Sequence, residues 1–320
     1  MNKILKYTVM IFTAAFFMMS CEKNVLDYDV TRDSSKAYVQ LLNQIPFPVG
    51  TEYNFYKAEL NGVDVCHNGN ALLNSWSFIP SGSVGAYYET PAGQASIKLY
   101  QGANRVLKYD QTIQLKEGKQ GLILYDLTKP PIVIDEPDYY IIDRTSYYTD
   151  TITYIRFFNL MREKIGVESN LKLQYQYQYV YNPIYTEADE LAGKIPAGSK
   201  LGDAVPAANR IRSPWINLGA PVGFGEDTGW QIVPVKKETW LTQGSARVDY
   251  RALVTQGGVV GVNMTANGVL ICRTSRSASA LTMSGYSDWW TGYIGRRQYH
   301  LFSGYRDDIP GMEIATAWIH

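Results

Sequence analysis

Few residues of this 320-residue chain have the types and spacing that catalysis or metal binding requires. Cys66 and His67 are adjacent, with Asp64 close by, but this spacing fits no structural zinc pattern, and a turn after a strand accounts for it better. Ser169 and Lys172 have the Ser-x-x-Lys spacing of a nucleophile and its base, which needs a helical turn, whereas Lys172 lies in a strand pattern. We therefore expect no catalytic centre, no metal site and no cofactor.

Aromatic residues near the end of the chain offer binding chemistry instead. Exposed Trp and Tyr rings stack on the apolar faces of sugar rings, and a neighbouring carboxylate accepts hydroxyl hydrogen bonds. The alternative is that these rings fill a core. Trp289 and Trp290 are adjacent on an expected strand and would point to opposite faces, so at most one of them need be buried. The candidate ligand-binding residues are Tyr286, Asp288, Trp289, Trp290 and Tyr293.

The start of the chain has the order of a secretory signal peptide. Lys3 and Lys6 precede an apolar run from Tyr7 to Met19 that is too short to span a bilayer, and Ser20 stands directly before Cys21. A cysteine at this point resembles the lipobox of bacterial lipoproteins, in which the thiol is acylated. The resemblance implies cleavage after residue 20 and a lipid on Cys21. The alternatives are an ordinary cleaved signal or a membrane-tethering helix.

Residues 21–35 are polar and are expected to form an acidic tether. Acidic residues after the lipidated cysteine resemble the signals that send some Gram-negative lipoproteins to the outer face of the outer membrane, so we expect a lipid-anchored protein at the cell surface. Without Lys3 and Lys6 the 30 basic residues fall to 28, against 30 acidic ones. This balance gives no electrostatic reason to expect nucleic acid as a partner.

The remaining sequence favours β structure, because it is rich in Tyr (25 residues) and contains seven Trp. Apolar and polar residues alternate from Leu171 to Tyr181, which predicts a long strand with one buried and one wet face. Shorter strands are expected at 38–42, 95–100 and 121–125, the last joined to 111–115 by a hairpin at Gly118-Lys119. We expect two buried free thiols, Cys66 and Cys272, rather than a disulfide between them.

Proline-rich sequence within 128–150 predicts a domain boundary, and similar segments recur on its two sides. The segment 38–43 returns as 154–159, 82–91 returns more loosely as 223–230, and 118–125 returns as 295–302. We therefore expect an all-β protein with two tandem antiparallel, Ig-like β-sandwich domains at 36–146 and 147–320. The second carries an insertion at 182–221, where a short helix is expected around 186–192 and where specificity would reside.

The first repeat also contains a set of motifs in a fixed order. These are the strand Tyr38–Asn43 followed by Pro46, the turn Asn61–Val65, the Gly85…Tyr88…Pro91-Ala92-Gly93 pattern, and the Gly118-Lys119 turn. Together they resemble the β-sandwich family called domain of unknown function 4397, which is common in bacterial surface lipoproteins and often occurs in tandem. The resemblance covers about 36–128 throughout and the second repeat in part. It implies fold and location, since the family has no assigned activity.

The sequence therefore predicts a non-catalytic cell-envelope lipoprotein that displays a binding surface for an extracellular glycan. The alternative is a structural or assembly subunit that binds a protein partner through sheet edges or through the face of Tyr175, Tyr177 and Tyr179. A hydrolase is the third hypothesis, and it would need an acid pair or a Ser/His site that the linear pattern does not reveal.

Overall fold

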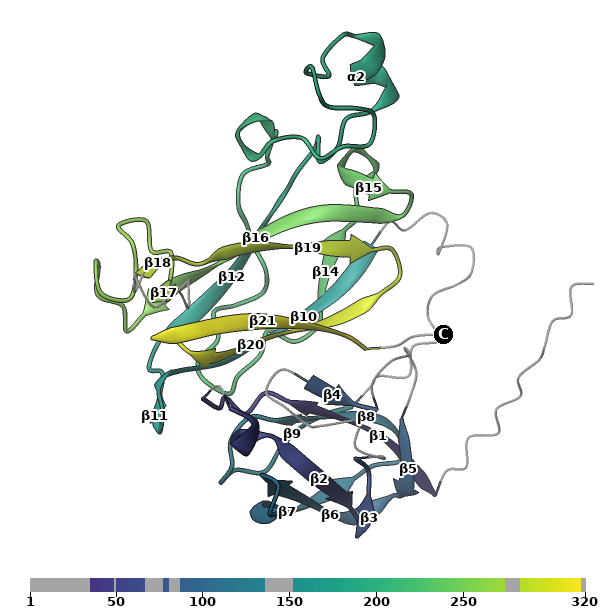
Figure 1. Ribbon diagram of the computed structural model, residues 1–320, viewed down its shortest axis with the longest axis vertical. Coiled ribbons are helices and arrows are strands. Elements are labelled where there is room, and N and C mark those ends of the chain that lie inside the picture. Colours follow the sequence, from purple (N-terminus) through teal and green to yellow (C-terminus); the bar gives the residue numbers. More distant parts are fainter. Residues whose placement is uncertain are drawn as a thin grey trace, which may run out of the picture. The chain divides into compact units, whose positions relative to one another are not determined.

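The computed structural model describes residues 35–48, 50–66, 77–80, 87–135, 152–273 and 283–317 (Figure 1). The expected signal peptide, Cys21 and the acidic tether lie outside these residues, as does His67. Within the described ranges, no helix is both long and apolar enough to cross a membrane.

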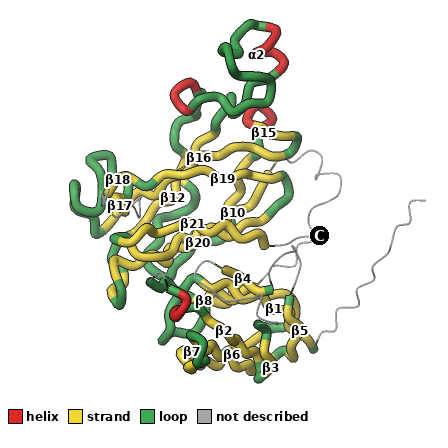
Figure 2. Tube along the Cα trace, in the orientation of Figure 1, coloured by secondary structure: helices red, strands yellow, loops and turns green. Residues whose placement is uncertain are grey.

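Most described residues lie in strands, as Figure 2 shows in yellow. Sheet A has the order β4-β1-β8-β9, with β5 also paired to β1, and sheet B has the order β3-β2-β6-β7. The strands of sheet A are β1 (Lys36–Asn43), β4 (Ser77–Ile79), β5 (Tyr88–Pro91), β8 (Gly118–Leu124) and β9 (Ile132–Asp135). Those of sheet B are β2 (Phe55–Leu60), β3 (Val63–Asp64), β6 (Gly93–Gln101) and β7 (Val106–Leu115).

Two further sheets follow in the sequence. Sheet C has the order β11-β10-β20-β21 with β14 beside β10, and sheet D has the order β13-β12-β16-β15 with β19 beside β16. The strands of sheet C are β10 (Ile152–Lys164), β11 (Val167–Glu168), β14 (Gln231–Pro234), β20 (Arg297–Tyr305) and β21 (Asp308–Ala317). Those of sheet D are β12 (Lys172–Tyr179), β13 (Ile216–Asn217), β15 (Trp240–Thr242), β16 (Ser245–Gln256) and β19 (Ser287–Tyr293), while β17 (Ile271–Arg273) pairs with β18 (Met283–Gly285).

Helical structure is sparse in the described part of the chain. The α-helix α2 (Glu187–Leu191) lies in the predicted insertion, near the expected position. Thr186 caps it, because its hydroxyl accepts a hydrogen bond from the amide of Asp189 while the Asp189 carboxylate accepts one from the amide of Thr186. Short 3-10 turns occur at Thr51–Tyr53, Ala207–Asn209 and Lys237–Thr239.

Two hydrophobic cores explain how the sheets pair. Buried side chains of β1 and β8 from sheet A pack with those of β2, β6 and β7 from sheet B. Buried side chains of β10 and β20 from sheet C pack with those of β12, β16 and β19 from sheet D. The prediction of a mainly-β protein is therefore confirmed.

Strand pairing is not antiparallel throughout. β1 pairs with β8 in parallel, and β10 pairs with β20 in the same way. The predicted hairpin at Gly118-Lys119 is wrong, because β7 pairs with β6 in sheet B whereas β8 belongs to sheet A. Instead of reversing within one sheet, the chain crosses between two sheets here. The Gln120 side chain stabilises this crossing through two hydrogen bonds to the backbone of Lys116. Its oxygen accepts from the Lys116 N–H, and its nitrogen donates to the Lys116 carbonyl.

The strand pairs of sheets A and B recur in sheets C and D. β1 lies between β5 and β8, as β10 lies between β14 and β20. Lys36 pairs with Pro91 as Ile152 pairs with Pro234, so β5 corresponds to β14 rather than to its predicted counterpart at 223–230. Asn43 and Asn159 are both fully buried, and each accepts a hydrogen bond from the amide two residues later.

The strand predicted over 171–181 is present as β12, and its tyrosines lie inside as expected. The opposite face of β12 is less exposed to solvent than predicted, because Gln174 and Gln178 are also buried. The Gln174 amide donates to the carbonyls of Leu218 and Gly219, which belong to the predicted insertion. The insertion therefore covers part of the outer face of sheet D, the face that points away from the core.

A third hydrophobic cluster joins sheet A to sheet C, within the compact unit to which the described residues belong. Polar contacts surround it, including an ion pair between Arg162 and Asp126 and a hydrogen bond from the Tyr305 hydroxyl to the Pro46 carbonyl (2.8 Å). Its buried members are Leu42, Ile123, Ile134, Phe158, Leu160, Tyr299 and Leu301.

Candidate functional site

The predicted aromatic cluster is divided between two faces of sheet D. Along β19 the side chains alternate, so Trp290 points into the core and Trp289 points outward. Trp290 is 2% exposed, and its ring packs edge-on against His300, with 4.9 Å between ring centroids. Tyr286 packs against the same core, and its hydroxyl lies 3.1 Å from that of Tyr250. These two rings serve packing.

The other members of the cluster remain accessible. Trp289 is 45% exposed, although the Arg247 guanidinium lies 4.2 Å from its ring centre. Tyr293 is half-buried, with the Arg296 guanidinium 3.9 Å from its ring centre. Asp288 is exposed, and its carboxylate accepts a hydrogen bond from the Trp289 amide (2.8 Å). Of the five predicted residues, Trp289 therefore offers the most open ring.

Residues that the sequence analysis did not select surround Trp289 on the outer face of sheet D. On β16, Arg247, Asp249 and Arg251 alternate with core residues and point outward, and Asp249 pairs directly with Trp289. The Asp249 carboxylate binds Arg247 through one oxygen and Arg212 through the other, both at 3.0 Å. The signal that could have revealed this face is the Arg-x-Asp-x-Arg alternation within a strand.

The insertion supplies a second aromatic residue to this face. The Arg251 guanidinium lies 4.2 Å from the ring centre of Trp215. Its Nε donates to the Gln176 side chain (2.8 Å), which in turn donates to the Asn217 side chain (2.7 Å). Two Arg–Trp pairs thus lie on one sheet face, where strands β12, β16 and β19 run side by side (Figure 1). We call Gln176, Arg212, Trp215, Arg247, Asp249, Arg251 and Trp289 the arginine face.

The core behind this face contains a neutral histidine. His300 is fully buried, its Nδ1 lies 3.0 Å from the Tyr175 hydroxyl, and its Nε2 has no hydrogen-bond partner among the described residues. Burial lowers the pKa of His300 to about 3. Because it is sealed from solvent, this imidazole has no route to a substrate.

The motifs considered for catalysis have structural roles. The Ser169 hydroxyl donates to Glu163 (2.8 Å) and accepts from the Leu171 amide (3.3 Å), which ties the turn before β12. The Asp64 carboxylate accepts a hydrogen bond from the Cys66 amide (2.9 Å). No group of three or more metal-ligating side chains occurs among the residues that the structure describes.

The two cysteines are not joined to each other. Cys272 is a free, buried thiol in β17, and burial raises its pKa to about 12. The prediction that Cys66 is also buried is wrong, because this side chain is only half-buried at the margin of the core between sheets A and B.

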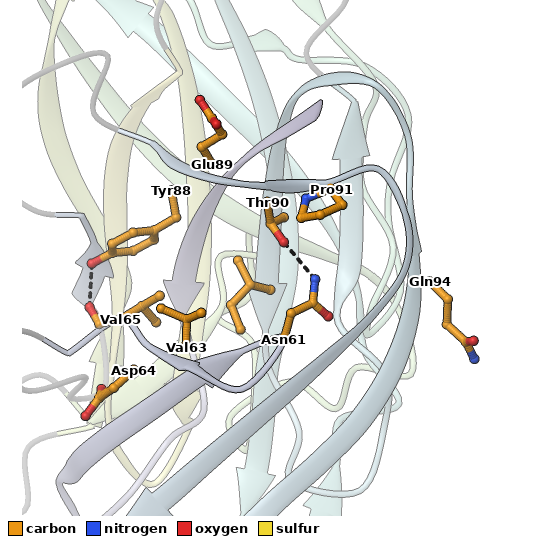
Figure 3. A pocket seen from close by; sticks show the side chains of 10 residues that line it. Asn61, Val63, Asp64, Val65, Tyr88, Glu89, Thr90, Pro91 and Gln94 are labelled. Atoms are coloured by element: carbon orange, nitrogen blue, oxygen red, sulfur yellow. Dashed lines mark hydrogen bonds between the residues drawn. The ribbon is translucent and has the colours of Figure 1, made fainter. Parts of the chain in front are cut away.

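A pocket of about 440 Å³ lies in the first pair of sheets (Figure 3). The Asn61 amide donates to the Thr90 hydroxyl (2.7 Å), and the Tyr88 hydroxyl donates to the Val65 carbonyl (2.5 Å). On the rim, Glu89 forms an ion pair with Lys36. The polar groups of this pocket already hold β3 and β5 in place. We therefore regard the arginine face as the stronger candidate for a ligand-binding site.

No family model and no curated protein matches this chain. This chain can be aligned with a solved structure described as the Bacillus anthracis TIE protein. The alignment covers 84% of this chain and 34% of that protein, with 8% sequence identity and a TM-score of 0.19. This chain therefore spans about a third of the length of that protein. A likeness this low carries no argument about fold or function, and the resemblance to the domain of unknown function 4397 stays a prediction.

Proposed function

We propose that this protein is a non-catalytic cell-envelope lipoprotein, anchored by lipid on Cys21 at the outer membrane, that binds an extracellular glycan on its arginine face. The observation that carries the binding proposal is the exposed ring of Trp289 on a sheet face rich in hydrogen-bonding side chains. Aromatic rings of this kind pack on the apolar faces of sugars, while planar guanidinium and amide groups bind hydroxyls.

We also propose that the sheets form two tandem β-sandwich domains that arose by duplication. The repeated pairing of β1, β5 and β8 by β10, β14 and β20 supports this, as do the two separate cores. In this proposal the second domain gained the insertion that supplies Arg212 and Trp215, and with them the binding face.

Replacing Trp289 by alanine is expected to abolish retention of the protein in glycan-containing affinity gels, because it removes the exposed ring. A panel of soluble polysaccharides in native gels measures the effect. Ile232→Ala is the matched control, since Ile232 is an exposed apolar residue of sheet C, and it is expected to leave retention unchanged. Equal retention of the Trp289 variant and the native chain would contradict the proposal.

Replacing Cys21 by serine is expected to move the protein from the membrane fraction to the soluble fraction, because a hydroxyl cannot take the thiol's place in lipoprotein processing. Labelling cells with palmitate and fractionating them measures this. The lipid anchor is excluded if the serine variant still incorporates palmitate or remains with the membrane.

The alternative function, binding of a protein partner, draws on a different part of the molecule. The tyrosines first suggested for it are buried, so they cannot form the contact surface. The loop after β16 instead exposes Val259, Val260 and Val262. Its backbone is fixed by hydrogen bonds, such as that from the Val259 amide to the Asn263 side chain. Concentration-dependent sedimentation of the soluble chain would favour this alternative.

A further inference from the structure

The arginine face has more positive than negative charge. Arg212 and Arg247 share the single carboxylate of Asp249, and Arg251 binds the neutral amide of Gln176. Arg210 also lies near: burial lowers the pKa of Arg247, Asp249 raises it, and the positive charges of Arg210 and Arg212 lower it further. The face would therefore attract a negatively charged ligand.

The guanidinium groups are held in place with donors still available. Each of Arg212, Arg247 and Arg251 uses its Nε for the bond to Asp249 or Gln176. The terminal nitrogens of Arg247 and Arg251 make no hydrogen bond to other described residues. Because Arg247 and Arg251 also lie against Trp rings, little side-chain entropy remains to be lost when an anion binds.

The spacing indicates an extended ligand. Arg247 and Arg251 are four residues apart on the same face of β16, which places them about 13 Å apart along the strand. A chain of sugars lying along β16 matches this backbone spacing better than a single sugar ring does.

The corresponding outer face of sheet B carries no such excess. There Lys57 pairs with Glu59, and Lys98 pairs with Asp110 at 3.6 Å. The Tyr100 hydroxyl also donates to Glu59. The paired charges of sheet B therefore contrast with the shared carboxylate of Asp249 on sheet D.

We propose that the ligand of the arginine face is an anionic glycan whose carboxylates pair with the terminal nitrogens of Arg247 and Arg251 while a sugar ring packs against Trp289. This inference rests on the proposed glycan-binding function and specifies its substrate class. The aromatic ring gives a sugar chain an advantage over other polyanions, because it rewards an apolar ring face that a charge-only ligand lacks.

The test compares two polysaccharides that share a backbone, polygalacturonate and its fully methyl-esterified form, which has no charge. The soluble chain is expected to bind polygalacturonate at least tenfold more tightly, with an affinity that falls as salt rises. Arg251→Gln is expected to remove most of this preference, and Arg251→Lys to restore it only in part because lysine lacks the planar fork. Lys98→Gln, on sheet B, is the control and is expected to change nothing.

The possible results separate this inference from the proposed function. Binding of both polysaccharides with equal affinity, lost on Trp289→Ala, would overturn the anionic preference and leave glycan binding intact. Binding of neither polysaccharide would overturn the inference. The proposed glycan binding is tested separately, and it would be overturned if the native chain were also not retained by any polysaccharide of the panel used for Trp289→Ala. Equal binding of single-stranded DNA at the same charge concentration would show a non-selective polyanion surface and would also overturn the inference.

Discussion

Lowering the pH from 7 to 5 is expected to reduce the free energy of unfolding by about 2 kcal/mol through His300 alone. The native pKa of this residue is about 3, because the ring is fully buried, whereas the unfolded chain has the ordinary value of 6.5. Between these two values the unfolded state binds a proton that the native state does not. The contribution of His300 to the free energy of unfolding is therefore fully present at pH values above 6.5, and it is lost progressively as the pH falls from 6.5 toward 3.

Urea denaturation of the native chain and of His300→Gln, each at pH 7 and pH 5, measures this contribution. Glutamine does not titrate, and its amide can still serve the Tyr175 hydroxyl, so the variant should lose about 2 kcal/mol less between the two pH values. An equal loss in both proteins would contradict the expectation. If the variant does not fold, NMR titration of the native chain decides, because the His300 ring should show no protonation between pH 7.5 and 5.

Replacing Phe158 by alanine is expected to destabilise the protein by about 3–5 kcal/mol, the usual cost of removing a buried Phe side chain. What should distinguish this variant is where in the molecule the destabilisation is felt. Phe158 is fully buried in the cluster that joins sheet A to sheet C, and its ring packs edge-on against Tyr299 at 6.2 Å between centroids. The loss should therefore loosen strands of both sheets.

Phe157→Ala is the matched control, because Phe157 is also fully buried but points into the core between sheets C and D. Hydrogen exchange followed by mass spectrometry reads each strand separately. Faster exchange in β1 and β8 is expected for Phe158→Ala and not for Phe157→Ala at matched residual stability. Unchanged exchange in β1 and β8 of the Phe158 variant would falsify the contact between sheets A and C in solution.

Some features of the candidate site could be predicted from the sequence, and others could not. Local alternation correctly separated Trp289 from Trp290, because successive strand side chains must point to opposite faces. It could not say which of the two faced the core. Nor could it bring Arg212 of the insertion to Asp249 or Trp215 to Arg251, since these contacts join segments separated by many residues.

The sequence by itself determined the mainly-β character, the strand positions around 38–42, 95–100 and 171–181, and the inward face of the tyrosine-rich strand. These follow from side-chain alternation and turn residues, which act over a few neighbouring positions. Only the tertiary structure decided that β8 pairs in parallel with β1, that the insertion covers Gln174, and that two arginines from distant segments share the carboxylate of Asp249. Those outcomes depend on which distant strands share a core, and the alternation of side chains along one strand does not specify which other strand it packs against.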